Sequence, residues 1–223
     1  MKKRLSRADR HRSIVEAAAD VFADQGFEGA TTKQIAAAAS VSPALLYEHF
    51  PSKEALYRAV LRKLVRDQDN LVVSLGIPAV TVDAQSNGAA AILRMLQGYF
   101  SACILRSGEE RDVTAHRLML ASLASDGTYA RLLYRRIMRR NLHTLAQAMD
   151  QARAAGDIAG EPLPAQSAFC FIEHVGSMLL STHLGKVPIA QYAEDGEKLV
   201  RQAALFCGRG LGLTAEALAR TCP

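Results

Sequence analysis

The chain has 223 residues, of which 49% are hydrophobic and 22% charged, and its formal net charge is +5 at pH 7. Such a composition predicts a globular protein and excludes a disordered or collagen-like chain. The charge is uneven, because residues 1–66 hold twelve Lys and Arg against seven Asp and Glu, whereas residues 67–223 hold fifteen of each. This predicts an anionic partner for the N-terminal part alone, the alternative being a basic tail that serves solubility.

The cysteines and the apolar stretches indicate where the protein works. The four cysteines are Cys103, Cys170, Cys207 and Cys222. They are far apart in sequence and form neither a disulfide framework nor a zinc-binding spacing. The basic start is not followed by an apolar stretch, so it does not predict a signal peptide. The chain has no run of about 18 uncharged apolar residues, the pattern that would predict a membrane span. We therefore expect a cytoplasmic protein with no membrane partner.

The first predicted elements are a basic arm and a helix. Residues 1–9 form the arm, which either adds contacts to DNA phosphates or is mobile without DNA. Residues 10–25 follow a helical period, with one apolar face: Ile14, Val15, Ala18, Val21 and Phe22. Gly26 can end this helix in the left-handed conformation.

Two short helices then follow in the stretch TTKQIAAAASVSPALLYEHF, residues 31–50. Thr31 or Thr32 caps the first of them. Ser42 is a good N-cap for the second, and Pro43 suits its first turn. A fourth helix begins at Lys53. Two short helices with a tight break predict a helix-turn-helix, in which the second helix enters the major groove of DNA. The alternative is a generic pair of helices within a bundle.

Residues 10–64 resemble the DNA-binding domain of the TetR (tetracycline repressor) family. The resemblance is carried by FADQGFEGATT, IAAAASVS and LLYEHFPSKEALYRAVL. It implies an all-α fold with a DNA-binding domain over residues 10–66 and a helical domain for effector binding and dimerisation over residues 67–223. There are two departures from the family pattern. Ser40 stands where glycine is usual, and Pro43-Ala44 replaces a frequent Lys-Gly, so the operator of a relative cannot be assumed.

The resemblance also implies how double-stranded DNA is held. Phosphate contacts are expected from Thr32, Tyr47, His49 and Lys53, although Tyr47 and His49 have packing roles as alternatives. Base contacts are expected from Lys33, Ser42, Pro43, Ala44 and Glu48. Glu48 either accepts a hydrogen bond from cytosine or turns away to pair with a neighbouring cation.

From about residue 85 the chain predicts long helices, over residues 89–105, 116–123, 129–155, 165–184 and 194–212. The last two combine apolar with small residues, which permit close helix packing. The resemblance implies that these two helices form a homodimer interface, and the candidate contacts are Ala168, Gly176, Ser177, Ser181, Ala203, Ala204 and Gly208. The alternative is that both helices are buried within one chain.

The resemblance further implies a site for a small-molecule effector in the second domain. Candidate lining residues are Tyr99, Cys103, His116, Met119, Tyr134, Met138, Phe169 and Met178. Most are aromatic residues or methionines at helical spacing, a pattern that core residues also produce. The polar pair Glu173-His174 lies in an apolar helix and is open to several roles.

These observations predict a homodimeric transcriptional repressor that a small molecule releases from a near-palindromic operator. Two alternatives within the same class are a ligand-regulated activator and a thiol-based redox sensor using Cys103 or Cys207. An enzyme is disfavoured, since the chain has no nucleophile elbow, P-loop or HExxH motif. Neither a cofactor nor a metal is expected. A helical bundle that binds membranes through its basic end is a further alternative.

Overall fold

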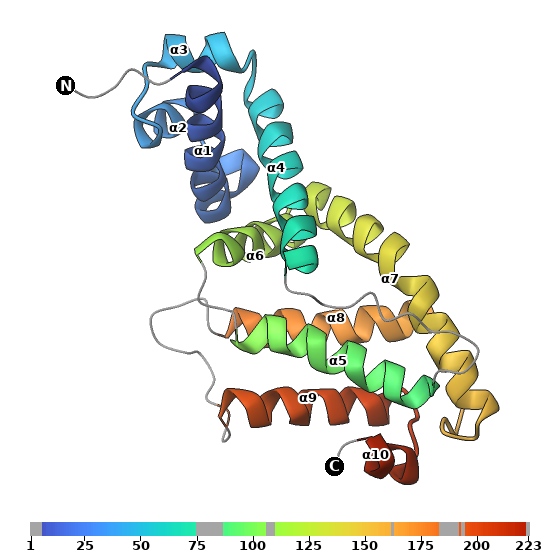
Figure 1. Ribbon diagram of the computed structural model, residues 1–223. Coiled ribbons are helices and arrows are strands. Elements are labelled where there is room, and N and C mark those ends of the chain that lie inside the picture. The colour runs from blue at the N-terminus through green and yellow to red at the C-terminus, as the bar shows by residue number, and fades with distance from the viewer. Residues whose placement is uncertain are drawn as a thin grey trace. The chain divides into compact units, whose positions relative to one another are not determined.

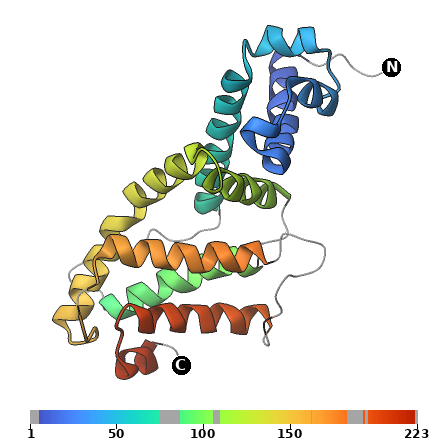
Figure 2. The same cartoon turned by 180° about the vertical axis from the view of Figure 1, so that it is seen from behind.

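The structure is a computed structural model that describes residues 6–74, 87–105, 110–161, 163–182, 192 and 195–221. Within these ranges the chain is helical, with one isolated antiparallel bridge between Ile158 and Leu213 (Figures 1 and 2). The helices are α1 (Arg7–Gly29), α2 (Thr32–Ala38), α3 (Pro43–His49), α4 (Lys53–Ser74), α5 (Gly88–Leu105), α6 (Glu110–Leu123), α7 (Thr128–Ala154), α8 (Ala165–Ser181), α9 (Gly196–Gly210) and α10 (Ala215–Thr221). The prediction of an all-α fold is confirmed.

The chain forms two compact units, each built from two segments that are not consecutive in sequence. The first comprises residues 1–75 and 110–133, and the second comprises residues 76–109 and 134–223. Helix α6 therefore belongs to the same unit as α1, although the sequence analysis assigned it to the second domain. The reason is long-range packing of α6 along α1. There the Thr114 hydroxyl donates to Asp20 at 3.0 Å, and Arg117 pairs with Asp24 at 3.3 Å.

The first unit is built around α1, which packs against α2, α4 and α6. Its side chains Ile14, Ala18 and Phe22 are fully buried. Gly26 takes φ +68°, which kinks the helix near its end, as the left-handed preference of glycine allows. Beyond the kink, the rings of Phe27 and Tyr57 pack 4.9 Å apart. The kink thus shapes the end of α1 that faces the start of α4.

Helix α5 is central to the second unit, where it packs against α8, α9 and α10. Its buried residues include Ile92, Leu96 and Phe100. Among the described helices, α5 alone is long and apolar enough to cross a membrane by length and composition, but half of that window is buried inside the protein. It also carries a charged side chain, Arg94. Its apolar character is explained by its place in the core.

Helix α10 was missed by the sequence analysis, which ended the helical region at residue 212. Thr214 provides its N-terminal cap by accepting a hydrogen bond from the Ala217 N–H at 3.2 Å. Arg220 donates to the buried carboxylate of Asp157, which connects α10 to the turn after α7. A threonine before the run Ala-Glu-Ala-Leu is a helix-start signal that predicts this element.

Candidate functional site

The helix-turn-helix begins with a capping box at the start of α2. The Thr31 side chain accepts from the backbone N–H of Gln34 at 3.2 Å, and the Gln34 side chain accepts from the backbone N–H of Thr31 at 2.9 Å. Both hydrogen bonds satisfy amide groups that a helix start otherwise leaves unpaired. Ile35 and Ala36 are buried against the rest of the unit. This fixes where α2 starts and which face it presents outward.

The turn after α2 is a Schellman motif that places serine at the left-handed position. The Val41 N–H donates to the Ala36 carbonyl at 2.9 Å, and the Ser40 N–H donates to the Ala37 carbonyl at 3.0 Å. Ser40 has φ +53°, so the positive φ considered from the sequence is confirmed. Helix α7 ends in the same pattern with Gly156, and helix α9 ends in it with Gly212. Serine at this position costs about 1 kcal/mol relative to glycine.

Helix α3 presents a polar surface on a buried anchor. The Ser42 hydroxyl accepts from the Leu45 N–H at 3.1 Å, and Pro43 occupies the first turn, as the sequence predicted. Leu46 is buried, and so is Phe50, the residue that follows the helix. The side chains that point to solvent are those predicted to read bases or contact phosphates: Ser42, Pro43, Ala44, Tyr47 and Glu48.

The remaining predicted DNA contacts lie at the ends of neighbouring helices. Lys33 on α2 is exposed, whereas Thr32 and His49 are half-buried. The Tyr47 hydroxyl lies 3.4 Å from the Thr32 hydroxyl, a long hydrogen bond that links α3 to the start of α2. Tyr47 is 51% exposed, so its side chain is not part of the core. The structure therefore brings Thr32 and Tyr47 together, whereas the His49 ring lies beside that of His11.

Lys53 is positioned differently from the other predicted phosphate contacts. Its ammonium group donates to the carbonyl oxygens of Phe27 at 2.8 Å and Ala30 at 3.1 Å, and it lies 4.5 Å from the centre of the Phe27 ring. Two of its three N–H groups thus already have partners within the protein. Lys53 connects the start of α4 to the end of α1, a structural role that the sequence analysis did not foresee.

The start of α1 adjoins the helix-turn-helix. The Ser6 side chain accepts from the Asp9 N–H at 3.1 Å, and the helix begins at Arg7. Residues 7–9 of the predicted arm are therefore the first turn of α1. The ring of His11, a residue that the sequence analysis did not single out, packs on Phe50 with ring centres 4.4 Å apart. The start of α1 therefore lies beside the end of α3.

Comparison with known proteins identifies this arrangement. Residues 14–60 match the sequence profile of the family described as bacterial regulatory proteins, tetR family. The first unit therefore carries a DNA-binding domain of the TetR type. That profile covers α2, α3, the greater part of α1 and the start of α4, the helices that build the surface described above. The match supports DNA binding by these helices.

Sequence similarity to individual regulators covers only part of the chain. The chain is 46% identical over 69 residues to the HTH-type transcriptional activator FasR of Mycolicibacterium smegmatis, which covers 31% of this chain and 30% of FasR. It is 50% identical over 54 residues to the HTH-type transcriptional regulator RutR of Escherichia coli, covering 24% and 26% of the two chains. The chain thus matches less than a third of the length of these relatives.

Solved TetR structures resemble nearly the whole chain. A regulatory protein of the tetR family from Rhodococcus superposes with a TM-score of 0.64 and 19% identity, covering 94% of this chain and all of that one. AibR, in complex with isovaleryl coenzyme A and operator DNA, superposes with a TM-score of 0.59 and 20% identity, covering 91% and 98%. At such identities the likeness establishes a common fold.

Three predicted effector residues meet in the second unit around Glu173. The Tyr134 hydroxyl donates to a carboxylate oxygen of Glu173, and the Tyr99 hydroxyl donates to the backbone carbonyl of Glu173 at 3.2 Å. The thiol of Cys103 contacts the Tyr99 hydroxyl. Burial raises the pKa of Glu173, while the hydrogen bond from Tyr134 and the proximity of His174 oppose that rise. We call Tyr99, Cys103, Tyr134 and Glu173 the polar cluster.

The other predicted effector residues do not join the polar cluster. His116 and Met119 lie on α6 and are buried in the first unit. Phe169 is partly buried against the core of the second unit, and Met138 is half-buried on α7. Met178 is 62% exposed on α8. The predicted set therefore has members in both units, and the hydrogen-bonded polar cluster unites only part of it.

Most of the small residues predicted for the dimer interface lie inside the second unit. The buried ones are Ala168, Gly176, Ala203, Ala204 and Gly208. A Cβ atom on Gly176 would lie 2.3 Å from the Tyr99 ring, so this glycine lets α5 approach α8. Ser177 and Ser181 are half-buried, and the Ser181 hydroxyl donates to the backbone carbonyl of Ser177 at 2.7 Å. These five residues thus pack within one chain, although Ala203 also lines the groove between α8 and α9.

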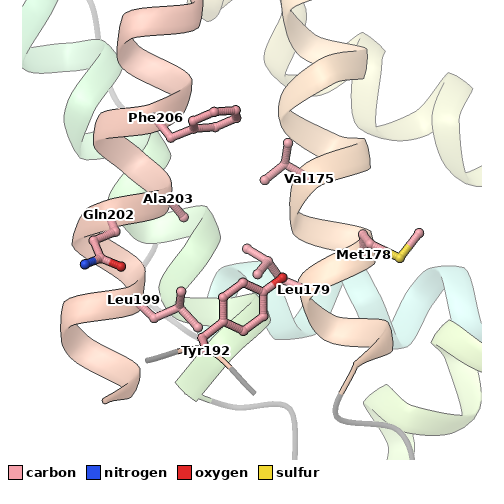
Figure 3. A pocket seen from close by; sticks show the side chains of 8 residues that line it. All are labelled: Val175, Met178, Leu179, Tyr192, Leu199, Gln202, Ala203 and Phe206. Atoms are coloured by element: carbon pink, nitrogen blue, oxygen red, sulfur yellow. The ribbon is translucent and has the colours of Figure 1, made fainter. Parts of the chain in front are cut away.

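Large apolar side chains are exposed on the same two helices instead. They are Phe171 at 60%, Met178 at 62% and Phe206 at 67%. An open groove of about 360 Å³ runs between α8 and α9, lined by Val175, Met178, Leu179, Tyr192, Leu199, Gln202, Ala203 and Phe206 (Figure 3). Phe171, Val175 and Met178 repeat at helical spacing, which indicates one face of α8 but not whether that face is buried.

Proposed function

We propose that the protein is a homodimeric transcriptional repressor that binds a near-palindromic operator and is released by a small-molecule effector. The observation that supports DNA binding best is α3, whose outer face of Ser42, Ala44 and Glu48 is exposed while Leu46 anchors its inner face. A short helix held in this way suits the major groove. The cationic surplus of residues 1–66 adds attraction to the phosphate backbone. We assign DNA binding to residues 10–66, and effector binding and dimerisation to residues 67–223.

The proposed contacts fall into two chemical classes. Thr32, Tyr47 and His49 carry hydrogen-bond donors at the edge of the surface and fix the position on the phosphates. Lys53 adds a phosphate contact through the one N–H group that does not bond to α1. Lys33, Ser42, Pro43, Ala44 and Glu48 face the bases.

Each base-facing residue type selects a different partner. Lys33 donates to guanine, and the aliphatic atoms of Pro43 or Ala44 contact a thymine methyl group. Glu48 accepts a hydrogen bond from cytosine N4. A carboxylate at the DNA surface is unfavourable without such a donor, so Glu48 contributes to specificity by rejecting other bases as well.

Dimerisation is proposed through the exposed apolar face of α8 and α9. Phe171, Met178 and Phe206 leave apolar surface in water that a second copy would cover. In a two-fold dimer the same face of each copy meets its partner, and two recognition helices then address half-sites about 34 Å apart. The half-buried Ser177 and Ser181 flank this face and are its proposed polar contacts.

The effector is proposed to act through the second unit, where the polar cluster provides hydroxyl groups and a carboxylate among apolar side chains. The other predicted residues remain effector candidates: Phe169, Met138 and Met178 in the second unit, and His116 and Met119 on α6 in the first. AibR, which shares this fold, is described in complex with isovaleryl coenzyme A and operator DNA together. A ligand changes DNA affinity only by its differential affinity for the two conformations.

The thiol-based alternative is weaker than ligand control. Burial raises the pKa of Cys103 to about 12 and that of Cys207 to about 11. Thiolate is the reactive form, so both thiols are slow to oxidise at neutral pH.

The activator alternative differs from repression in where the operator lies relative to its promoter. Operator binding by a repressor or by an activator requires a cytoplasmic location.

The testing experiment is selection of bound sequences from a random duplex pool by the full chain. An enriched near-palindrome is the expected result, and absence of any enriched motif would overturn the proposal. Ala44→Glu on the exposed face of α3 should abolish enrichment, whereas Ala154→Glu, at an equally exposed alanine on α7, should leave it unchanged. A reporter carrying the selected operator then distinguishes repressor from activator by the sign of its response.

A further inference from the structure

His11 lies where α1 meets the end of the recognition helix. Its ring stacks on Phe50, with ring centres 4.4 Å apart and planes inclined by 29°. Phe50 is 5% exposed, so it forms a fixed base for the His11 ring. The ring of His49 lies 5.9 Å from that of His11. Two imidazoles from different helices are therefore held side by side.

This pair lies on the proposed DNA-binding surface. His49 is a proposed phosphate contact at the end of α3, and His11 is exposed on the adjoining α1. Arg7 lies four residues before His11 and shares its face of the helix. A phosphate bound by His49 would therefore also meet a second ring and a guanidinium group.

We propose that His11 is a further DNA-contact residue, which together with His49 binds one backbone phosphate and makes operator affinity depend on pH. This inference rests on the proposed function. In the free protein, burial and the neighbouring His49 disfavour the charged form of His11. A phosphate placed against both rings offsets that effect and favours protonation. The pair thus gains positive charge where DNA supplies negative charge.

The surroundings determine the sign of the pH dependence. Burial and the neighbouring His49 lower the pKa of His11 below its ordinary value of 6.5. On α1 the nearby charged groups are Arg7, Asp9, Arg10 and Arg12, of which Asp9 lies 3.7 Å from Arg12. On α3 and at the start of α4 they are Glu48, Lys53 and Glu54, with Lys53 directed to the end of α1.

Binding to phosphate raises the histidine pKa relative to the free protein. The gain in affinity is therefore complete below the free-protein pKa and is lost as pH rises through the pKa of the complex. For histidine this window falls between about pH 5 and pH 8. Each proton taken up changes affinity by up to about tenfold per pH unit within it.

The experiment measures operator affinity by fluorescence anisotropy across this range at constant ionic strength, using the selected operator duplex. Wild-type affinity should rise as pH falls. His11→Phe keeps a ring on Phe50 but cannot ionise, so it should lose about half of the logarithmic slope. His143→Phe, which changes an exposed histidine on α7, is the matched control and should keep the full slope.

A second variant and a direct measurement keep the test decisive if His11→Phe folds poorly. His11→Gln should show the same reduced slope. Calorimetric titrations in buffers of different ionisation enthalpy should show about one proton fewer taken up on binding by either variant than by wild type. Equal slopes and equal proton uptake for the wild type and the His11 variants would overturn the inference while leaving operator binding intact. Absence of operator binding at every pH would overturn the proposed function itself.

Discussion

The ammonium group of Lys53 lies 2.8 Å from the carbonyl oxygen of Phe27, which joins the first residue of α4 to the end of α1. A second hydrogen bond to the Ala30 carbonyl, at 3.1 Å, makes the contact a bidentate one. Because α3 is connected to the rest of the unit by the turn before Lys53, this contact also sets where the recognition helix stands. Structural and DNA-binding roles of Lys53 are therefore separable by experiment.

Lys53→Met retains the aliphatic stem but removes the ammonium group that donates both hydrogen bonds. The free energy of unfolding should fall by about 1–3 kcal/mol, because two partly buried carbonyls lose a charged partner. Chemical denaturation measures this loss. The salt dependence of DNA affinity provides the second readout, since loss of a phosphate contact reduces its slope by about one. Unchanged stability would contradict the role assigned to this contact.

Ser40→Gly should stabilise the protein by about 1 kcal/mol, because glycine takes positive φ without the Cβ clash. The reverse change, Gly156→Ser, tests the same motif at the end of α7. A Cβ atom on Gly156 meets nothing within 4 Å, so only its φ of +77° is at issue. Thermal unfolding should therefore shift in opposite directions for the two variants. Shifts of the same sign would show that neighbouring contacts outweigh backbone strain at Ser40.

Gly176→Ala should destabilise the second unit by about 1–3 kcal/mol, as overpacking does in well-filled cores. The added methyl group would lie 2.3 Å from the Tyr99 ring and displace the polar cluster. Gly210→Ala is the control, because a Cβ atom there meets no neighbour within 4 Å at the end of α9. That variant should be neutral or stabilised by up to about 1 kcal/mol. Calorimetric unfolding of the two proteins compares them directly.

Glu173→Gln should make stability less dependent on pH. Burial raises the pKa of Glu173 above its ordinary value of 4.5, so ionisation is harder in the folded state than in the unfolded state. The contribution of Glu173 to the stability of the folded state is therefore fully present below the unfolded-state pKa and is lost as pH rises through the folded-state pKa. Relative to wild type, the variant should gain stability as pH rises through that window. Parallel stability curves for the two proteins would refute this assignment.

Phe206→Glu should convert the proposed dimer to a monomer. The carboxylate would lie in the groove between α8 and α9, where a second copy is proposed to pack, and would have no partner there. Leu123→Glu changes a side chain that is 53% exposed on α6, and serves as the control. Sedimentation equilibrium should give a monomer mass for the first variant and a dimer mass for the second. A dimer in both cases would place the interface elsewhere.

The helix-turn-helix could be predicted from sequence because its signals are local. The threonine and serine caps, Pro43 and the left-handed turn residue lie within a few positions of the helix ends that they define. The packing of α6 on α1 could not be predicted in this way, because Asp20 and Thr114 are far apart in sequence and their pairing follows from the tertiary fold. The same holds for Lys53, whose spacing fits either a phosphate or a carbonyl partner.

The small residues of α8 and α9 illustrate a different difficulty. Gly176 and Ala204 indicate close packing of helices, but not which helices approach. In the structure Gly176 accommodates Tyr99 of α5, within the same chain. Exposure of Phe206 was equally invisible in the sequence, because a phenylalanine at helical spacing has the same pattern on an inner or an outer face.

The packing of α6 on α1 bears on how new regulators of this kind can arise by recombination. A gene fusion that exchanged residues 1–66 alone would separate Asp20 and Asp24 from Thr114 and Arg117, and would pair α6 with a foreign α1. A new operator specificity is therefore inherited together with α6, or else through the few exposed positions of α3 such as Ala44 and Glu48. Single substitutions in α3 are thus the less disruptive evolutionary route to a different target sequence.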